Sequence, residues 1–520
     1  MAKAKIPNQK NAYKKLASRL NGYTKKVLAI YSYLAKESAK LAISAGYDGE
    51  GEFSFDDYPK TRKKVNALWN YFSSNMEAIV YDGISKEWEN SNELQDLLAR
   101  KVIRSYTRKV GETKLKTYYE HNSAALQSFK KRKVQGLNLS KRIWSQQEGV
   151  RQNLEKAIAT GIEKGMSAVK LSKRVSQYLN DYPSLAKDYK KKYGKAIDIT
   201  ACEYRSVRLA RNEINMAYRT AEQERWRHMD YIKGKEIKIT KSLRHQHDMC
   251  DELAGMYPRD FQWNGWHVNC MCYAIPVVMS EEEYWSDGSK GFVNTIPEQY
   301  NKWIDNNAER IINSKSTPTF ISSNLKYLKP GDVRVNEAGK IYAELSNDSN
   351  YTNVMRNDLG GVYALHKGHH IGDESDRKFF GGKLSGFDLE KEFALGMYEK
   401  GHSVILCNEC EKKGKDIVTS LDFMMDGERI DVRSITTKRD EYSSAIKAKN
   451  KQLARFNAEN STSYDSLCLY FHDPNMFSEK AITKGYKKFC LSRKNRPHTF
   501  RRILCVLNEP SGLVEKEFLF

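Results

Sequence analysis

Cysteine and histidine side chains gather in one short stretch of the chain. They form an HxxC pair from His247 to Cys250 and an HxxCxC group from His267 to Cys272. Such short turns aim soft or borderline donors at one tetrahedral centre, as in many zinc sites. The candidate zinc ligands, one of them surplus, are His247, Cys250, His267, Cys270 and Cys272. The alternative is a buried cluster of reduced cysteines packed against the neighbouring tryptophans without a metal.

Acidic and basic residues farther along the chain are spaced as phosphodiester cleavage requires. Alternate residues of a strand point to one face, so Asp431 and Arg433 would meet the same substrate. Asp422 would lie on the preceding strand, because Asp426-Gly427 is a typical turn between two strands. Carboxylate oxygens are hard ligands. Asp422 and Asp431 are therefore candidates to bind a catalytic Mg²⁺ or Mn²⁺.

Two expected helices extend this candidate site. Residues 389–401 are expected to place Glu392 ahead of the first central strand, and residues 446–454 to bring Gln452 to the aspartates. Arg433 stands where such sites usually have lysine. An arginine cannot be deprotonated to assist a water, although it can clamp a phosphate, so activity is retained, weakened or lost. The alternative for the whole pattern is a surface hairpin with solvated charges.

Two other groups carry less weight. The CxxC spacing of Cys407 and Cys410 has no second pair, which favours incidental thiols at a strand end over a redox or zinc role. Lys367, His369 and His370 are expected on an exposed polar loop, with metal or RNA binding as the alternative.

The elements that must position these residues change along the chain. Residues 11–229 are rich in Leu, Ala, Lys and Tyr with helical periodicity, clearest from Val207 to Ala221. A Ser/Thr/Pro run at 314–319 indicates a linker, and the last third alternates β-rich apolar runs with helical patterns. We therefore expect a multidomain protein with a mainly α-helical region at 1–236, a small His/Cys metal-stapled segment at 237–280, a helix and linker at 281–350, and an α/β domain at 351–520.

The composition indicates an acidic partner. The 520 residues carry a formal charge of +22 and a pI of about 9.3, which favours a nucleic acid as partner, although Lys-rich helix surfaces alone would give the same balance. We expect no secretory signal and no membrane span. Nine cysteines, thinly spread, favour reduced thiols over a disulfide framework.

The His/Cys segment resembles that of the phage Mu F-like minor head proteins, also called head morphogenesis proteins. The resemblance lies in an Arg-rich helix at 205–227, then C-x-x-L-x-G from Cys250 to Gly255, then H-x-N-C-x-C from His267 to Cys272. The family often has cysteine where this chain has His247. The resemblance implies a structural protein inside the phage head, with portal and capsid proteins and packaged DNA as partners.

The C-terminal pattern resembles the tRNA nuclease domains of bacterial contact-dependent inhibition toxins, which belong to the PD-(D/E)xK class. The resemblance covers residues 360–520 and depends on the order of elements that carry Glu392, Asp422, Asp431, Arg433 and Gln452. It implies a restriction-endonuclease-like fold, metal-dependent cleavage of RNA, and an immunity protein as a further partner.

The combined hypothesis is a minor head protein of a virion that carries a toxin-like nuclease domain. One alternative is a purely structural virion protein whose C-terminal domain kept the fold and lost catalysis. The other is a host-encoded polymorphic toxin that uses the helical region for packaging.

Overall fold

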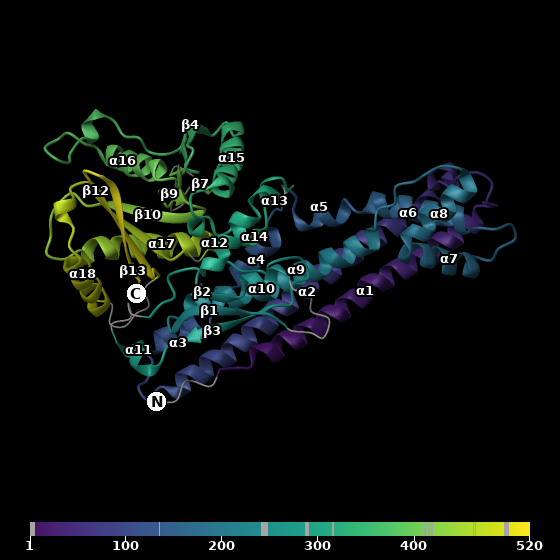
Figure 1. Cartoon of the computed structure of the whole chain (residues 1–520), viewed down its shortest axis with the longest axis horizontal. Helices are drawn as coiled ribbons and strands as arrows, with labels where there is room; N and C mark the ends of the chain where they lie inside the picture. Colours follow the sequence, from purple (N-terminus) through teal and green to yellow (C-terminus); the bar gives the residue numbers. More distant parts are fainter. Residues whose placement is uncertain are drawn as a thin grey trace.

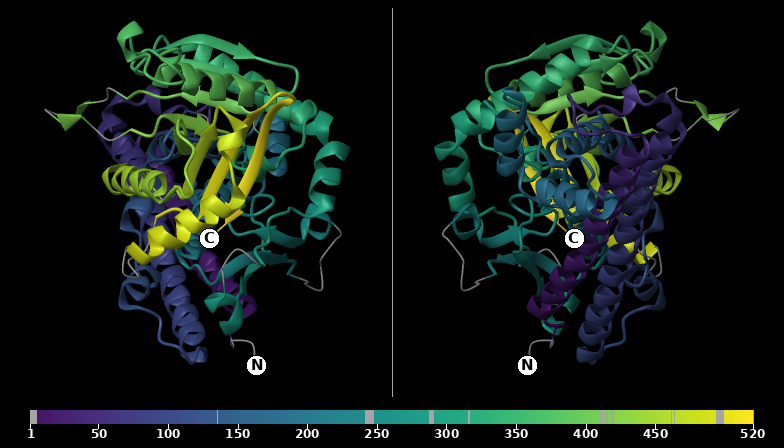
Figure 2. Two further views of the ribbon diagram at one scale, coloured as in Figure 1. Left: turned by 90° about the vertical axis from the view of Figure 1, so that its left-hand side faces the viewer. Right: turned by 90° about the vertical axis from the view of Figure 1, so that its right-hand side faces the viewer.

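The computed structural model describes residues 6–134, 136–240, 248–286, 291–314, 317–409, 412–413, 416–417, 420–460, 462, 464–492 and 499–519. They form a long helical arm joined to a rounded end that carries the β-sheets (Figure 1). The two views of Figure 2 look at the molecule from the sheet end and from the tip of the arm. The multidomain organisation, with a helical N-terminal region and a C-terminal part built on a mixed sheet, is confirmed.

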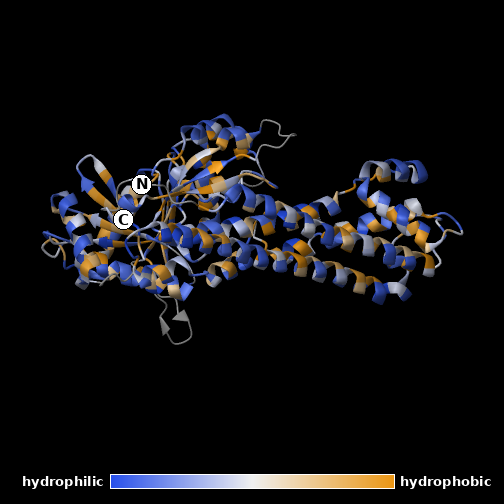
Figure 3. Ribbon diagram, turned by 90° about the horizontal axis from the view of Figure 1, so that it is seen from below, coloured by the Kyte–Doolittle hydropathy of each residue, from blue (hydrophilic) through white to orange (hydrophobic). Residues whose placement is uncertain are grey.

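Three long helices form the shaft of the arm: α1 (Gln9–Ser44), α2 (Arg62–Ser105) and α9 (Cys202–His228). Their apolar residues recur every three or four positions, as the repeated orange segments along these helices in Figure 3 show, and they pack together in one core. The expected stripe in α9 is confirmed, since Ala210, Ile214 and Ala217 are fully buried. At Gly83 a Cβ atom would lie 2.4 Å from Ile214 Cδ1, so glycine permits the close approach of α2 to α9.

Shorter helices complete the arm. They are η1 (Phe55–Asp57), η2 (Pro59–Thr61), α4 (Ser123–Lys131), α5 (Leu139–Trp144), α6 (Gln147–Gly161), α7 (Ala168–Asn180) and α8 (Tyr182–Tyr193). Helix α3 (Glu112–Tyr118) lies at the sheet end instead, where Tyr118 belongs to a second hydrophobic core (Figure 1). Helices α6, α7 and α8 gather at the far tip (Figure 1). They share one hydrophobic core with α1, α2 and α9, so the arm is a single packed unit.

The segment after α9 folds as a small antiparallel sheet in the order β2-β1-β3. Its elements are β1 (Ile232–Lys238), α10 (Met249–Leu253), β2 (Gly255–Pro258) and β3 (Tyr273–Val278). The helices that follow are α11 (Glu281–Trp285), α12 (Glu298–Asn306), α13 (Ala308–Ile312), α14 (Thr319–Ser322), η3 (Leu325–Tyr327) and α15 (Asp332–Asn347). A second core joins α12 to α14 with the small sheet. The expected linker region is thus largely helical, and α15 packs on the C-terminal sheet.

The C-terminal sheet has eight strands in the order β13-β12-β11-β10-β9-β6-β5-β4. The strands are β4 (Tyr351–Arg356), β5 (Val362–His366), β6 (Ser403–Leu406), β9 (Phe423–Met425), β10 (Glu428–Ser434), β11 (Ser466–Phe471), β12 (Arg502–Glu509) and β13 (Gly512–Leu519). Strands β10, β11 and β12 are mutually parallel, as are β5 and β6. The remaining short elements are η4 (Glu374–Asp376), η5 (Pro474–Met476) and a separate pair, β7 (Lys412–Lys413) and β8 (Asp416–Ile417).

Helices cover both faces of this sheet. Helix α16 (Gly386–Glu399) packs on one face, and α17 (Ser443–Asn460) and α18 (Glu479–Ser492) pack on the other (Figure 1). In β10, Ile430 and Val432 face α16, so the intervening Asp431 points toward α17. The expected helices around Glu392 and Gln452 correspond to α16 and α17 and are confirmed.

Candidate functional site

Two aspartates and a lysine meet in the C-terminal sheet. Asp422 directly precedes β9 and Asp431 lies in β10, and the register Phe423↔Ile430 of this hairpin brings the two carboxylates together. Helix α17 adds Lys449, whose Nζ lies 2.6 Å from Asp431 Oδ1 and 3.6 Å from Asp422 Oδ2. The expected pairing of Asp422 with Asp431 is therefore present in the fold.

Burial makes the charged form of Asp431 unfavourable. The side chain of Asp431 is fully buried, and its Oδ2 has no hydrogen-bond partner. Burial and the neighbouring Asp422 raise the pKa of Asp431 well above its usual value, against the opposing effect of Lys449. Burial would lower the pKa of Lys449, but the two carboxylates outweigh it and the net shift is upward. An orphaned carboxylate oxygen beside a second carboxylate fits a divalent cation.

The cation at the carboxylates is Lys449, not Arg433. Arg433 is exposed, and it forms no hydrogen bond or ion pair with the described part of the chain. Its charge nevertheless acts to lower the pKa of Lys449. Gln452 Oε1 lies 3.4 Å from Lys449 Nζ, and its Nε2 donates to the Ser420 carbonyl at 3.0 Å. Lys449 could have been inferred from the sequence, because residues three apart on a helix lie on the same face and Gln452 was a candidate for this site.

Glu392 does not join the aspartates. Its carboxylate accepts hydrogen bonds from His472 Nδ1 at 2.6 Å and from Asn508 Nδ2 at 2.9 Å. Helix positions two apart differ by about 200° in direction, so the neighbouring Glu390 points the opposite way. The charge of Asp422 contributes to the raised pKa of Glu390, whose main cause is burial. The charge of Asp422 thus acts on Glu390, an acidic residue of α16.

The loop residue His369 is buried rather than exposed, which corrects the expectation for this segment. Its Nε2 lies 3.2 Å from Glu390 Oε2, and its Nδ1 lies 2.9 Å from Glu409 Oε1 and 2.9 Å from the Cys407 carbonyl. Burial would lower the pKa of His369, but the two carboxylates raise it to about 10. His369 is therefore a doubly donating imidazolium at neutral pH. Cys410, the partner of Cys407 in the CxxC, lies outside the described residues.

The cysteines of the His/Cys segment converge on one point. Cys250 Sγ lies 3.8 Å from Cys270 Sγ and 3.1 Å from His267 Nε2, and the thiol of Cys272 belongs to the same cluster. Zn–S bonds of about 2.3 Å at tetrahedral angles would separate two sulfurs by about 3.8 Å. His267 Nδ1 lies 2.8 Å from the Val268 carbonyl, which leaves Nε2 as the donor to a metal. The donor set can hold a metal ion.

The other candidate ligand, His247, lies outside the described residues. Asp248 Oδ2 approaches His267 Nε2 to 3.6 Å, and these two residues with Cys250 form a second possible donor group. Cys250 thus belongs to both groups: one with Cys270 and Cys272, the other with Asp248 and His267.

Helix α9 holds the cysteine turn in place. The buried Arg219 donates from Nη2 to the carbonyl oxygens of Cys270 at 2.6 Å and Cys272 at 2.9 Å, and from Nη1 to Asn264 at 3.1 Å. Its guanidinium also stacks over Trp263 at 4.5 Å. These contacts fix the cysteine turn to helix α9 of the arm.

Comparison with known proteins gives this chain no relative from which a role can be transferred. None of the helices within the described ranges is long and apolar enough to cross a membrane. No family model matches the sequence, and no curated protein or solved structure is significantly similar to it.

Proposed function

We propose that residues 351–520 form a metal-dependent nuclease of the PD-(D/E)xK class, carried by a phage minor head protein. The observation that carries the proposal is the meeting of Asp422, Asp431 and Lys449, with one oxygen of Asp431 buried and unpaired. The order of elements supports it, because helix α16, the strands β6, β9 and β10, helix α17 and strand β11 follow one another as in that class. The restriction-endonuclease-like fold is part of this proposal.

Each residue of the candidate site would have its own role in cleavage. Asp422 and Asp431 would hold a Mg²⁺ or Mn²⁺ ion, which supplies charge compensation at the scissile phosphate. Lys449 would take the position of the lysine two residues after Asp431 in other members of the class, reaching the same carboxylates from α17. Its ammonium can hold a phosphate oxygen or orient a water. Exposed Arg433 would clamp the substrate backbone.

The helical arm and the His/Cys segment supply the minor head part of the proposal. Cys250, His267, Cys270 and Cys272 would bind one structural Zn²⁺, because three thiolates and an imidazole are the ligands that Zn²⁺ prefers. The arm would contact portal and capsid proteins in the virion, and its Lys-rich surface would lie against packaged DNA without reading its sequence. An immunity protein would protect the producing cell.

The test is cleavage by the full chain. Purified protein is incubated with tRNA and, separately, with plasmid DNA, with Mg²⁺ and with EDTA. We expect Mg²⁺-dependent cleavage of tRNA that Asp431→Asn and Asp422→Asn each abolish. Asp358→Asn, an exposed aspartate of the same domain, is the matched control and should cleave like wild type. Absence of cleavage of either nucleic acid by the wild type, at any divalent ion supplied, would contradict the nuclease proposal.

One observation favours the alternative of a structural virion protein. Lys449 already forms a 2.6 Å ion pair with Asp431, and such a pair can stabilise a sheet without any catalysis. This alternative predicts that Asp431→Asn changes the stability of the chain while no metal-dependent activity exists to be lost.

A further inference from the structure

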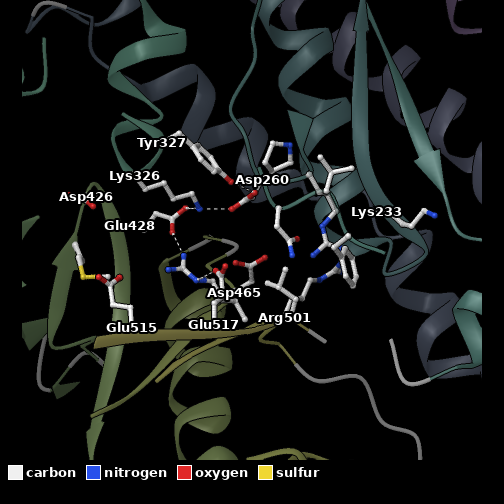
Figure 4. Close-up of a pocket in the computed structure, with 18 of the residues that line it drawn as sticks. Lys233, Asp260, Lys326, Tyr327, Asp426, Glu428, Asp465, Arg501, Glu515 and Glu517 are labelled. Carbon is white, nitrogen blue, oxygen red and sulfur yellow. Dashed lines mark hydrogen bonds and ion pairs between the residues drawn. The ribbon is translucent and has the colours of Figure 1, made fainter. Parts of the chain in front are cut away.

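A cavity of about 300 Å³ lies where the C-terminal sheet meets the small sheet of the His/Cys segment (Figure 4). One wall comes from β1, β2 and the segment 292–294, and the other from β12, β13 and the turn after β9. None of the residues proposed above for cleavage lines it. It is therefore a separate feature that only the docking of the two parts creates.

Most charges in the cavity wall are paired. Lys326 binds both Asp260 and Glu428, and its 2.9 Å contact with Glu428 crosses to the C-terminal sheet (Figure 4). Arg502 Nε lies 2.6 Å from Glu517. Asp426 and Glu515, at the left of Figure 4, lie 2.7 and 3.5 Å from the ring nitrogens of His402.

Two arginines in the wall form no ion pair with the described residues. Arg501 has a buried Nη1 without a hydrogen-bond partner, and its side chain makes no ion pair within the described ranges. Among the described residues Arg259 forms one hydrogen bond, from Nη1 to the Ile232 carbonyl at 3.4 Å, which is long for a hydrogen bond. The carboxylate of Asp465 lines the same cavity and influences both guanidiniums, yet it forms no ion pair with either.

Carboxylates and cations both line the cavity, and the described cations without an ion pair gather around Arg259 and Arg501. Burial, followed by the charge of Arg501, lowers the pKa of Arg259 to about 9. The same two causes lower the pKa of His228 to about 3, and burial with Arg227 lowers the pKa of Lys235 to about 7. Each of these shifts reports desolvated cations near one another. Buried cations of like sign are unfavourable until an anion lies between them.

We propose that this cavity binds a phosphate group of a nucleotide or nucleic acid between Arg259 and Arg501. Guanidinium forks match phosphate oxygens in geometry and charge. Phe292 stands beside the site, its ring 5.4 Å from the Arg259 guanidinium, and offers an aromatic face to a nucleobase. The volume suits a ligand of about mononucleotide size. Because both parts of the chain supply an arginine, the bound ligand fastens the C-terminal domain to the arm.

The experiment is thermal unfolding of the full chain with increasing inorganic phosphate, AMP or a short RNA oligonucleotide, at ionic strength matched with chloride. The wild type should gain several degrees in Tm with a saturating ligand. AMP should bind more tightly than phosphate if Phe292 stacks on the base. If the bound phosphate belongs to a nucleic-acid backbone, only the oligonucleotide should raise the Tm. Arg501→Gln and Arg259→Gln should each weaken binding by about tenfold or more.

A second readout separates binding from a merely structural role. Without ligand, Arg501→Gln should melt at the same temperature as wild type or higher, because it removes a guanidinium whose Nη1 is buried without a partner. Arg310→Gln, an exposed arginine on α13 outside the cavity, is the control and should bind like wild type. The inference is wrong if no anion shifts the wild-type Tm, if Arg501→Gln responds like wild type, or if it melts lower without ligand. Asp431→Asn should still bind, so failure of the nuclease proposal would leave this result intact.

Discussion

Replacing Lys449 with methionine gives the most direct test of the carboxylate group. Methionine keeps much of the side-chain volume and removes the charge that faces Asp431 and Asp422, at 2.6 and 3.6 Å. The lysine side chain is 11% exposed and that of Asp431 is fully buried, so water screens the pair poorly. Breaking a buried pair by removing one partner costs about 3–5 kcal/mol. For a domain of about 170 residues this lowers Tm by roughly 6–20 °C.

The loss should depend on pH and on Mg²⁺. Without Lys449 the pKa of Asp431 rises further above its unfolded value, so the destabilisation is largest above neutral pH and shrinks as the pH falls and Asp431 takes up a proton. Millimolar Mg²⁺ should restore part of the Tm of Lys449→Met, because the ion replaces the missing positive charge. The assay is thermal unfolding at pH 5 and pH 8, with and without Mg²⁺. A drop in Tm that is the same at both pH values, or that Mg²⁺ leaves untouched, would refute the reasoning about charge.

Three further outcomes are expected. The chain should bind one zinc ion by elemental analysis, and Cys272→Ser should lose it and make α9 exchange amide hydrogens faster, since Arg219 joins the two. His369→Gln should lower the free energy of unfolding by at most about 5 kcal/mol, measured in urea titrations. Because the pKa of His369 is raised to about 10, this loss should have its full size below about pH 6.5 and disappear as the pH rises past 10. If the chain cleaves RNA, Arg433→Lys should retain activity while Arg433→Glu weakens substrate binding and raises KM, in steady-state kinetics.

Residues close in sequence were predictable from the sequence alone. The cysteine and histidine spacing predicted the cluster at Cys250, Cys270 and Cys272 because short turns leave few ways to arrange the side chains. Asp422 and Asp431 were predictable for the same reason, since an Asp-Gly turn pairs the two strands around it. Helical periodicity likewise identified the buried face of α9.

Tertiary packing decided which residues complete these groups. The sequence pattern located α16 but did not fix its rotation. Glu392 was predicted at the aspartates but binds His472, and the charge of Asp422 acts on Glu390. Lys449 replaced Arg433 as the partner of Asp431 because α17 crosses β10 at that point. The meeting of Arg259 with Arg501 depends on the docking of parts about 240 residues apart in the chain. Local spacing constrains only near neighbours, whereas the rotation of a helix and the docking of domains follow from the shape of the whole core.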